Sequence, residues 1–226
     1  MLKYYFEIEL IDNRYAKYDD LSLFTYHDEQ INNDIAELNK IYRGQQAKIL
    51  KKLHGIFSKK IENNNMNQFA ISFPRYDKEH YTFGNIIRVF SETKESLEKL
   101  IEENNLTTTE EYNITRVYRV PEKRIIGYAF YKKVQTHFST KSARINRYKK
   151  RHSDISNNEI ENMYKDFGIK NKRQAEYPYI KIFSVSNNRY YPLSIRKEFV
   201  NSATNNNNYS SFGLTLSDDI CAVPEW

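Results

Sequence analysis

The sequence has little cysteine and no long apolar runs. Among its 226 residues there is one cysteine, Cys221. A single cysteine can form neither an internal disulfide nor a cluster of cysteine metal ligands, so we expect a reducing compartment, the cytoplasm. No apolar run is long enough to span a bilayer, and no signal peptide is evident, so we expect no membrane partner. The length suits one large domain or two small ones, either of which can bury a core.

Acidic residues are missing from one long stretch, Lys132 to His152, although the chain has 29 of them. This stretch contains eight of the 35 basic residues, which leaves 27 basic and 29 acidic residues in the rest of the chain. The net charge of +6 is therefore a local excess. A local basic patch indicates an anionic partner such as nucleic acid or a membrane surface.

The first half of the chain predicts a β-α-β-β-α-β order of elements, from alternating and helical apolar patterns. The expected strands are at 3–12, 68–74, 85–91 and 111–120. The expected helices are at 28–42, 45–61 and 93–104, with Gly44 interrupting the first two. This order is that of a ferredoxin-like, RRM-like unit, so we expect a ferredoxin-like domain over 1–120, where Pro121 ends the last strand.

The second half predicts a C-terminal α+β domain over 121–226, so the whole protein is expected to be α+β. Its expected strands are at 127–135, 179–186, 189–196 and 209–216. Its expected helices are a basic one at 139–152, capped by Ser139, Thr140 or Ser142, and one at 156–168. The second helix has a possible capping box of Ser156 and Glu159, and Gly168 at its end.

The basic helix has the composition of a nucleic-acid-binding element. Arg144, Arg147 and Arg151 fall within an arc of about 60°, and the second half of the helix has only Ile145 and Tyr148 as apolar residues. A solvated charged face is the plain alternative, but there are no acids here to pair with the cations. A membrane surface would require a larger apolar face. No aromatic run of the RNP1 type is present, so we expect a folded RNA or duplex DNA as partner, not single-strand stacking on the first sheet.

Short motifs occur in a consistent order along nearly the whole chain. They are KYYFEIELI, KLHGIF, ISFPRY, KKVQ, RYKKRH, YPYIKIFSVSNNRYYPLSIR and YSSFGLTL followed by AVPEW. In this order they resemble the CRISPR repeat-processing endoribonuclease of type I-F systems, except that the stretch 13–45 is longer than usual for that family.

The resemblance implies an enzyme that binds the CRISPR repeat hairpin and cuts the RNA at the 3′ base of the stem, without metal or other cofactor. The upstream 2′-hydroxyl attacks the phosphate and leaves a 2′,3′-cyclic phosphate. The enzyme then stays on the crRNA and joins other subunits of a type I-F surveillance complex.

The resemblance also implies three catalytic positions. His54, in KLHGIF, is the general base, and an imidazole has an ordinary pKa of about 6.5, suited to taking a proton at neutral pH. Ser184 holds the 2′-hydroxyl in line with the phosphate. Phe212 stands where the family often has tyrosine, so it can orient the imidazole but cannot donate a hydrogen bond.

For RNA binding the resemblance implies a larger set of residues on the linker, the basic helix and the last strands. Gln135 suits an adenine edge. Lys133 replaces an arginine, which weakens recognition of guanine, and Tyr191 keeps an aromatic face for the terminal base pair. The full set is Lys133, Gln135, Arg144, Arg147, Lys150, Arg151, Ser186 and Tyr191.

Two alternatives remain from the sequence. One is a non-catalytic hairpin-RNA-binding protein of the same fold, for which Phe212 leaves room. The other is a DNA-binding regulator whose basic helix enters a duplex major groove.

Overall fold

The computed structural model describes residues 2–11, 28–64, 66–134, 141–152, 156–165, 177–184, 188–203, 208–216 and 221–226. By its contacts the chain divides into two compact units. One consists of Met1–Val134 together with Pro178–Trp226, and the other is Gln135–Tyr177. This grouping differs from a division at residue 120, which stays a prediction. The two units are described separately below.

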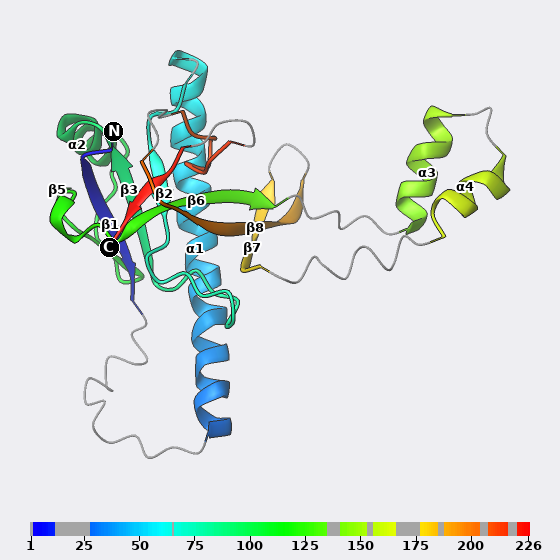
Figure 1. The fold of residues 1–226 in the computed structure, drawn as a ribbon, viewed down its shortest axis with the longest axis horizontal. Coiled ribbons are helices and arrows are strands. Elements are labelled where there is room, and N and C mark those ends of the chain that lie inside the picture. Colours follow the sequence, from blue (N-terminus) through cyan, green and yellow to red (C-terminus); the bar gives the residue numbers. More distant parts are fainter. Residues whose placement is uncertain are drawn as a thin grey trace. The chain divides into compact units, whose positions relative to one another are not determined.

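The first unit contains two antiparallel sheets, so the expected α+β class is confirmed (Figure 1). The strands of the first sheet are β1 (Tyr4–Leu10), β2 (Ala70–Ser72), β3 (Ile86–Ser91), β4 (Tyr112–Ile114) and β5 (Tyr118–Arg119). Their order is β2-β3-β1-β4, and β5 also pairs with β1. The ferredoxin-like description of this half of the chain stays a prediction.

The predicted fourth strand, 111–120, is divided into β4 and β5, which pair with different parts of β1. Thr115 lies between them, and its side-chain oxygen accepts the backbone N–H of Glu7 at 2.9 Å. The Thr115 N–H in turn donates to the Glu7 carbonyl oxygen at 3.0 Å. A side-chain oxygen thus replaces a backbone partner, which interrupts the regular ladder without leaving Glu7 N–H unpaired.

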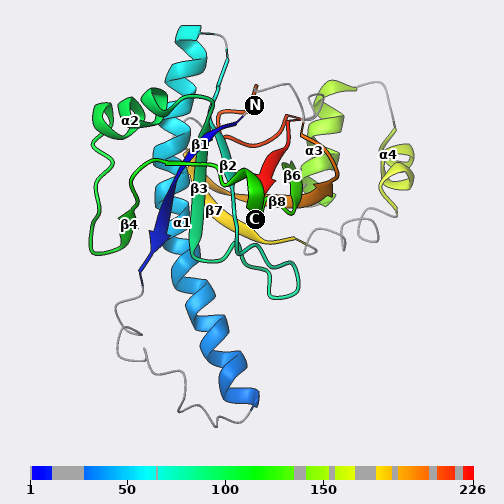
Figure 2. The ribbon, with the colours of Figure 1, turned by 60° about the vertical axis from the view of Figure 1, so that its left-hand side comes forward.

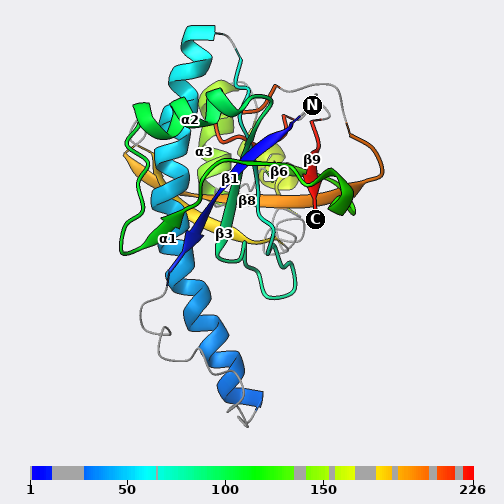
Figure 3. The ribbon, with the colours of Figure 1, turned by 90° about the vertical axis from the view of Figure 1, so that its left-hand side faces the viewer.

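Helix α1 (Asp28–Asn64) is continuous, so the prediction that Gly44 interrupts it is wrong. Gly44 lies on an exposed side of the helix, and a side chain there would meet nothing within 4 Å. A helical glycine costs only about 1 kcal/mol relative to alanine. Burial of Leu50, Leu53 and Phe57 further along the same helix outweighs that cost. The first turns of α1, in blue, extend beyond the sheets in each view (Figures 1, 2 and 3).

The second helix, α2 (Lys94–Glu103), lies within the predicted range 93–104. Thr93 is its N-cap, and the Thr93 hydroxyl accepts the N–H of Ser96. Asn104 is the C-cap, and its side-chain amide donates to the Leu100 carbonyl oxygen at 2.9 Å. Leu97 and Leu100 are buried, as the apolar spacing predicts. After β5, a short 3-10 helix η2 (Glu122–Arg124) leads to the second sheet.

The second sheet consists of β6 (Gly127–Val134), β7 (Tyr179–Ser184), β8 (Arg189–Val200) and β9 (Val223–Glu225), in the order β7-β8-β6-β9. The predicted strand at 209–216 is absent from the described segment 208–216, which makes only isolated bridges and a turn. Gly213 has φ of 69°, a left-handed conformation that breaks a strand. The end of the chain supplies β9 in its place.

One hydrophobic core joins the two sheets and α1. It includes Phe6 of β1, Phe57 of α1 and Leu193 of β8. Hydrogen bonds also cross between the sheets: the Tyr76 hydroxyl, which follows β2, donates to the carbonyl oxygen of Ile195 on β8 at 3.0 Å. The residues of β7 and α1 are therefore positioned by the same packed interior.

The second unit contains α3 (Lys141–Arg151) and α4 (Asn157–Met163). The predicted capping box is confirmed: the Ser156 hydroxyl accepts the Glu159 N–H at 3.3 Å, and the Glu159 carboxylate accepts the Ser156 N–H at 3.1 Å. Ser142 lies inside α3 and is not its cap, whereas Ser139, Thr140 and Gly168 lie outside the described residues.

The two helices of this unit contact each other through aromatic rings. Tyr148 of α3 stacks on His152, with centroids 4.3 Å apart, and meets Tyr164 edge-on at 6.1 Å. Ile160 of α4 is buried. Among the described helices of the whole chain, none is both long and apolar enough to cross a membrane.

Candidate functional site

His54 lies on the part of α1 that the core holds most firmly. Its neighbour Leu53 and the residues one turn away, Leu50 and Phe57, are buried. His54 itself is half-buried, at the edge of that apolar face. The helix is thus fixed by packing while the imidazole keeps access to solvent.

One hydrogen bond determines which nitrogen of His54 carries the proton. His54 Nδ1 lies 3.1 Å from the carbonyl oxygen of Ser211. A carbonyl oxygen can only accept, so the Nδ1–H must be the donor. In the neutral imidazole the lone pair is then on Nε2, which can accept a proton from another group. The Ser58 hydroxyl makes a longer contact of 3.5 Å with Nδ1.

The ring of Phe212 holds the plane of the same imidazole. The two rings are stacked, with centroids 4.1 Å apart and an interplanar angle of 3°. Phe212 is only 7% exposed, so its own position is restrained by packing. The hydrogen bond from Nδ1 and the stacked ring together fix both the tilt and the rotation of His54.

The turn that carries Ser211 and Phe212 is built by Ser210 and Gly213. The Ser210 hydroxyl accepts the N–H groups of Phe212 at 3.3 Å and Leu214 at 3.1 Å. The carbonyl oxygen of Gly213 accepts the N–H of Ile71 on β2 at 2.8 Å. A side chain at Gly213 would come within 2.8 Å of Ile71 Cγ1, so glycine is required for both the backbone angle and the space. The turn is therefore anchored to the first sheet.

Two cation–π contacts align α1 with β7. Arg43 lies over the ring of Tyr179 and Lys51 over the ring of Phe183, each at 5.4 Å. Eight helical residues rise about 12 Å, and four strand residues rise about 13 Å, so helix and strand run side by side in the same direction (Figure 1). One further turn of α1 reaches His54 and one further residue of β7 reaches Ser184, at the same level.

Ser184 also lies on the core-facing side of β7. Side chains alternate along a strand, so Ser184 shares its face with Ile180 and Ile182, which are buried in the core that contains Leu53. Ser184 is half-buried at the end of the strand, where this face opens to solvent. We conclude that β7 directs Ser184 towards the side on which α1 presents His54.

Two predicted RNA-binding residues share that face of the sheet. Tyr191 is paired with Ile182 across β7 and β8, and Lys133 is paired with Ile195 across β6 and β8. The ammonium of Lys133 lies 5.5 Å from the centroid of the Tyr191 ring. Burial raises the pKa of the Tyr191 hydroxyl above its ordinary value, so it remains neutral at neutral pH. The first unit thus brings together His54, Phe212, Ser184, Tyr191 and Lys133.

The other predicted RNA-binding residues are not part of this group. Arg151 is exposed on α3 in the second unit. The helix also contains Arg144, Arg147 and Lys150, whose side chains lie outside the described part of the structure, as do Gln135 and Ser186.

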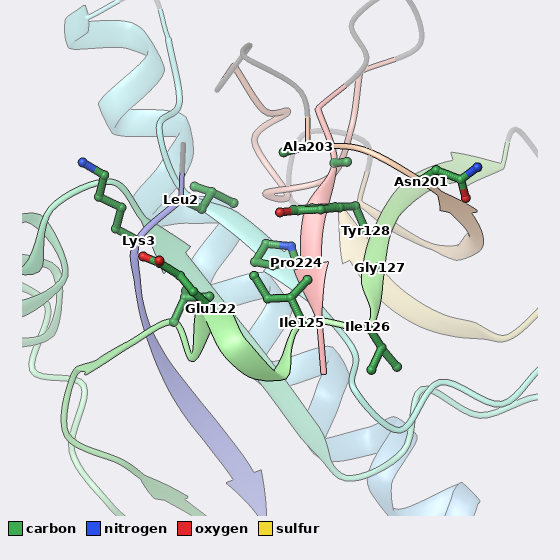
Figure 4. Close-up of a pocket in the computed structure, with 12 residues that line it drawn as sticks. Leu2, Lys3, Glu122, Ile125, Ile126, Gly127, Tyr128, Asn201, Ala203 and Pro224 are labelled. Atoms are coloured by element: carbon green, nitrogen blue, oxygen red, sulfur yellow. The ribbon is translucent and has the colours of Figure 1, made fainter.

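A pocket of about 500 Å³ lies elsewhere, where the segment 120–128 passes β9 (Figure 4). It is lined by residues such as Ile125, Tyr128 and Pro224, with Lys3 and Glu122 as its charged residues, and it contains none of the predicted site residues. Within the described ranges, no three His, Cys, Asp or Glu side chains come together as metal ligands.

The analysis of charge overlooked a second acid-free segment, on α1. From Lys40 to Ile61 the chain has seven lysines or arginines and no acidic residue. Acids elsewhere hide this segment when charge is summed over the whole remainder of the chain. A count in a moving window would have found it. The cation–π contacts of Arg43 and Lys51 needed the structure, because their partners lie more than 130 residues away.

Comparison with known proteins agrees with this arrangement. Residues 42–226 match the model of a family described as CRISPR-associated protein (Cas_Csy4). The match begins inside α1 and covers the turn at 208–216, β7 and both helices of the second unit. Among curated proteins no match is found.

Proposed function

We propose that this chain, which belongs to the Csy4 family of CRISPR-associated proteins, is a metal-independent endoribonuclease that cuts the repeat hairpin at the 3′ base of its stem. Membership of the family means that the protein is of the type I-F kind and processes CRISPR repeat RNA. The finer chemistry rests on one observation above all. The Nδ1–H of His54 is held by the carbonyl oxygen of Ser211, which leaves the lone pair on Nε2.

In the proposed reaction, Nε2 of His54 takes the proton of the 2′-hydroxyl upstream of the scissile phosphate. The 2′-oxygen forms a bond to phosphorus, and the bond from phosphorus to the 5′-oxygen breaks. The leaving oxygen keeps the electron pair and takes up a proton from water. The products are a 2′,3′-cyclic phosphate and a 5′-hydroxyl, and no water molecule is added in this step.

The role proposed for Ser184 is to orient the 2′-hydroxyl. An intramolecular attack gains most of its rate from alignment of the nucleophile with the leaving group. The hydroxyl of Ser184 can accept or donate a hydrogen bond, and it lies level with His54 along α1. Tyr191 offers a ring for the last base pair of the stem, and Lys133 beside it offers charge for a phosphate.

The RNA-binding part of the proposal assigns α3 to the phosphates of the stem. Arg151 is exposed there, and α3 has no acidic residue. Phosphate contacts need charge more than exact placement, because they depend largely on counterion release. We further propose that the protein stays on its product and joins other subunits of a surveillance complex in the cytoplasm.

The test is cleavage of a small panel of repeat hairpins by the purified protein in excess chelator. We expect cleavage to continue, with a 3′ end that resists phosphatase until acid opens the cyclic phosphate. The matched control RNA has a single 2′-deoxy substitution upstream of the scissile phosphate, which should be bound but not cut. A strict requirement for Mg²⁺, or cleavage of the deoxy control, would overturn the proposed mechanism.

A further inference from the structure

The mechanism above does not use the cations that α1 presents to β7. Lys48 and Lys60, on other sides of the helix, pair with acidic residues of neighbouring segments. Arg43 and Lys51 lie instead over aromatic rings. Neither β7 nor the first seven residues of β8 contain an acid, so the surface formed by these elements is strongly positive.

Aromatic rings alternate with the cations along this surface. Phe183 of β7 meets Tyr190 of β8 edge-on, with centroids 5.1 Å apart. Tyr190 is 69% exposed, and Lys51 covers the Phe183 ring beside it. Flat rings that face solvent next to cations are the usual composition of surfaces that bind single-stranded nucleic acid, since bases stack on the rings and cations contact the phosphates.

This surface is on the opposite side of β7 from Ser184. Strand alternation places Tyr179, Lys181 and Phe183 on one face, and Ser184 on the other. Because β7 is at the edge of its sheet, a flexible chain at Ser184 can pass round that edge without crossing another strand. One residue of β7 separates the two faces, so the path is short.

We propose that this surface, the flank surface, binds the single-stranded RNA that follows the scissile phosphate on its 3′ side. It consists of Arg43, Lys51, Tyr179, Lys181, Phe183 and Tyr190. The inference rests on the proposed function, which places the scissile phosphate at His54 and Ser184. On the 5′ side of that phosphate the RNA is the paired stem, whose stacked bases cannot reach the rings. The unpaired 3′ flank can reach them, and only the uncut precursor has it.

The flank surface therefore distinguishes substrate from product. Contacts to the 3′ flank strengthen binding of the precursor and are lost when the flank leaves. The contacts to the stem remain, and these hold the product.

The experiment compares two RNAs that share one repeat hairpin. The first ends at the cleavage site, as the product does, and the second continues for about ten unpaired nucleotides and has a 2′-deoxy substitution that prevents cleavage. We expect wild-type protein to bind the extended RNA more tightly. In Tyr190→Ala this advantage should fall roughly 5- to 100-fold, the range for one lost base–aromatic stack. Lys51→Ala should lower the salt slope for the extended RNA by about 0.7, as for one single-strand phosphate.

The controls separate this surface from general loss of folding or charge. Tyr190→Phe keeps the ring and should bind as wild type does. Lys52→Ala removes an equal charge beside Lys51, but from a side chain that donates to the carbonyl oxygen of Asn105, and should change neither affinity. All variants should bind the product hairpin with wild-type affinity, which also shows that they are folded.

Each outcome bears on one proposal. Equal binding of the two RNAs by wild type, or an equal loss for both RNAs in Tyr190→Ala, overturns the flank surface but not the nuclease. A clear advantage for the extended RNA in a protein that fails to cut any hairpin supports the surface and overturns the catalytic mechanism. Failure to bind either RNA overturns both.

Discussion

Helices α1 and α3 both have an acid-free run of cations, yet they are held in different ways. In α1 the run from Lys40 to Ile61 has seven cations in 22 residues, and in the stretch of α3 the run from Lys132 to His152 has eight in 21. The apolar face of α1 is fully buried at Leu50, Leu53 and Phe57. The described apolar residues of α3, Ile145 and Tyr148, are only partly buried.

This difference suits the two helices to different tasks. A helix fixed by core packing can hold one imidazole in a defined orientation, as α1 holds His54, and proton transfer requires such placement. A helix with little buried surface and repelling cations gains stability when a polyanion neutralises them. Phosphate binding tolerates small displacements, so α3 does not need a rigid support.

The largest effect that we expect is on catalysis, from the packed helix. Replacing His54 with alanine removes the proposed base and should lower the single-turnover cleavage rate about 10²-fold or more. Affinity for the hairpin should be almost unchanged, because the stem phosphates contact other residues. Ser58→Ala is the matched control on the next turn of α1, where the hydroxyl makes only a long contact with His54. An unchanged rate in His54→Ala would remove the catalytic role from α1.

The next effect concerns stability. Leu53→Ala leaves a cavity in the core and should lower the free energy of unfolding by about 2–5 kcal/mol. Ile145→Ala on α3 should lower it much less, because that side chain is already partly exposed. Trp226 is the only tryptophan and packs edge-on against Tyr5 and Phe90, so its fluorescence in a urea titration reports on the first unit. Similar losses in both variants would mean that the two helices are supported alike.

The smallest effects should come from single cations of α3. Arg147→Ala and Arg151→Ala should each weaken hairpin binding and lower the dependence of affinity on salt by roughly one phosphate contact. Lys149 lies about 140° from Arg144 around the helix, so Lys149→Ala should do much less. The measurement is hairpin affinity at several salt concentrations. Wild-type affinity and slope in both arginine variants would show that α3 is only a solvated face.

Local features of the fold were predictable because neighbouring residues encode them. The capping box of Ser156 and Glu159 follows from a spacing of three residues, and the burial of Leu97 and Leu100 follows from helical spacing. Two local predictions were wrong for non-local reasons. Packing of α1 against β7 and β1 outweighs the helix-breaking tendency of Gly44, and Ile71 and Phe57 enforce the turn at Gly213 instead of a strand.

By itself the sequence determined the class of the fold, the charge of the helices and, through its motifs, the family and the residues to examine. It could not decide how His54 is held, because the carbonyl oxygen that accepts its Nδ1–H belongs to Ser211, 157 residues further along the chain. Nor could it align α1 with β7, which depends on rings meeting cations across the same distance in sequence. Patterns of charge and periodicity are properties of adjacent residues. A tautomer, a stacked ring and a shared level between helix and strand exist only once packing has brought distant segments together.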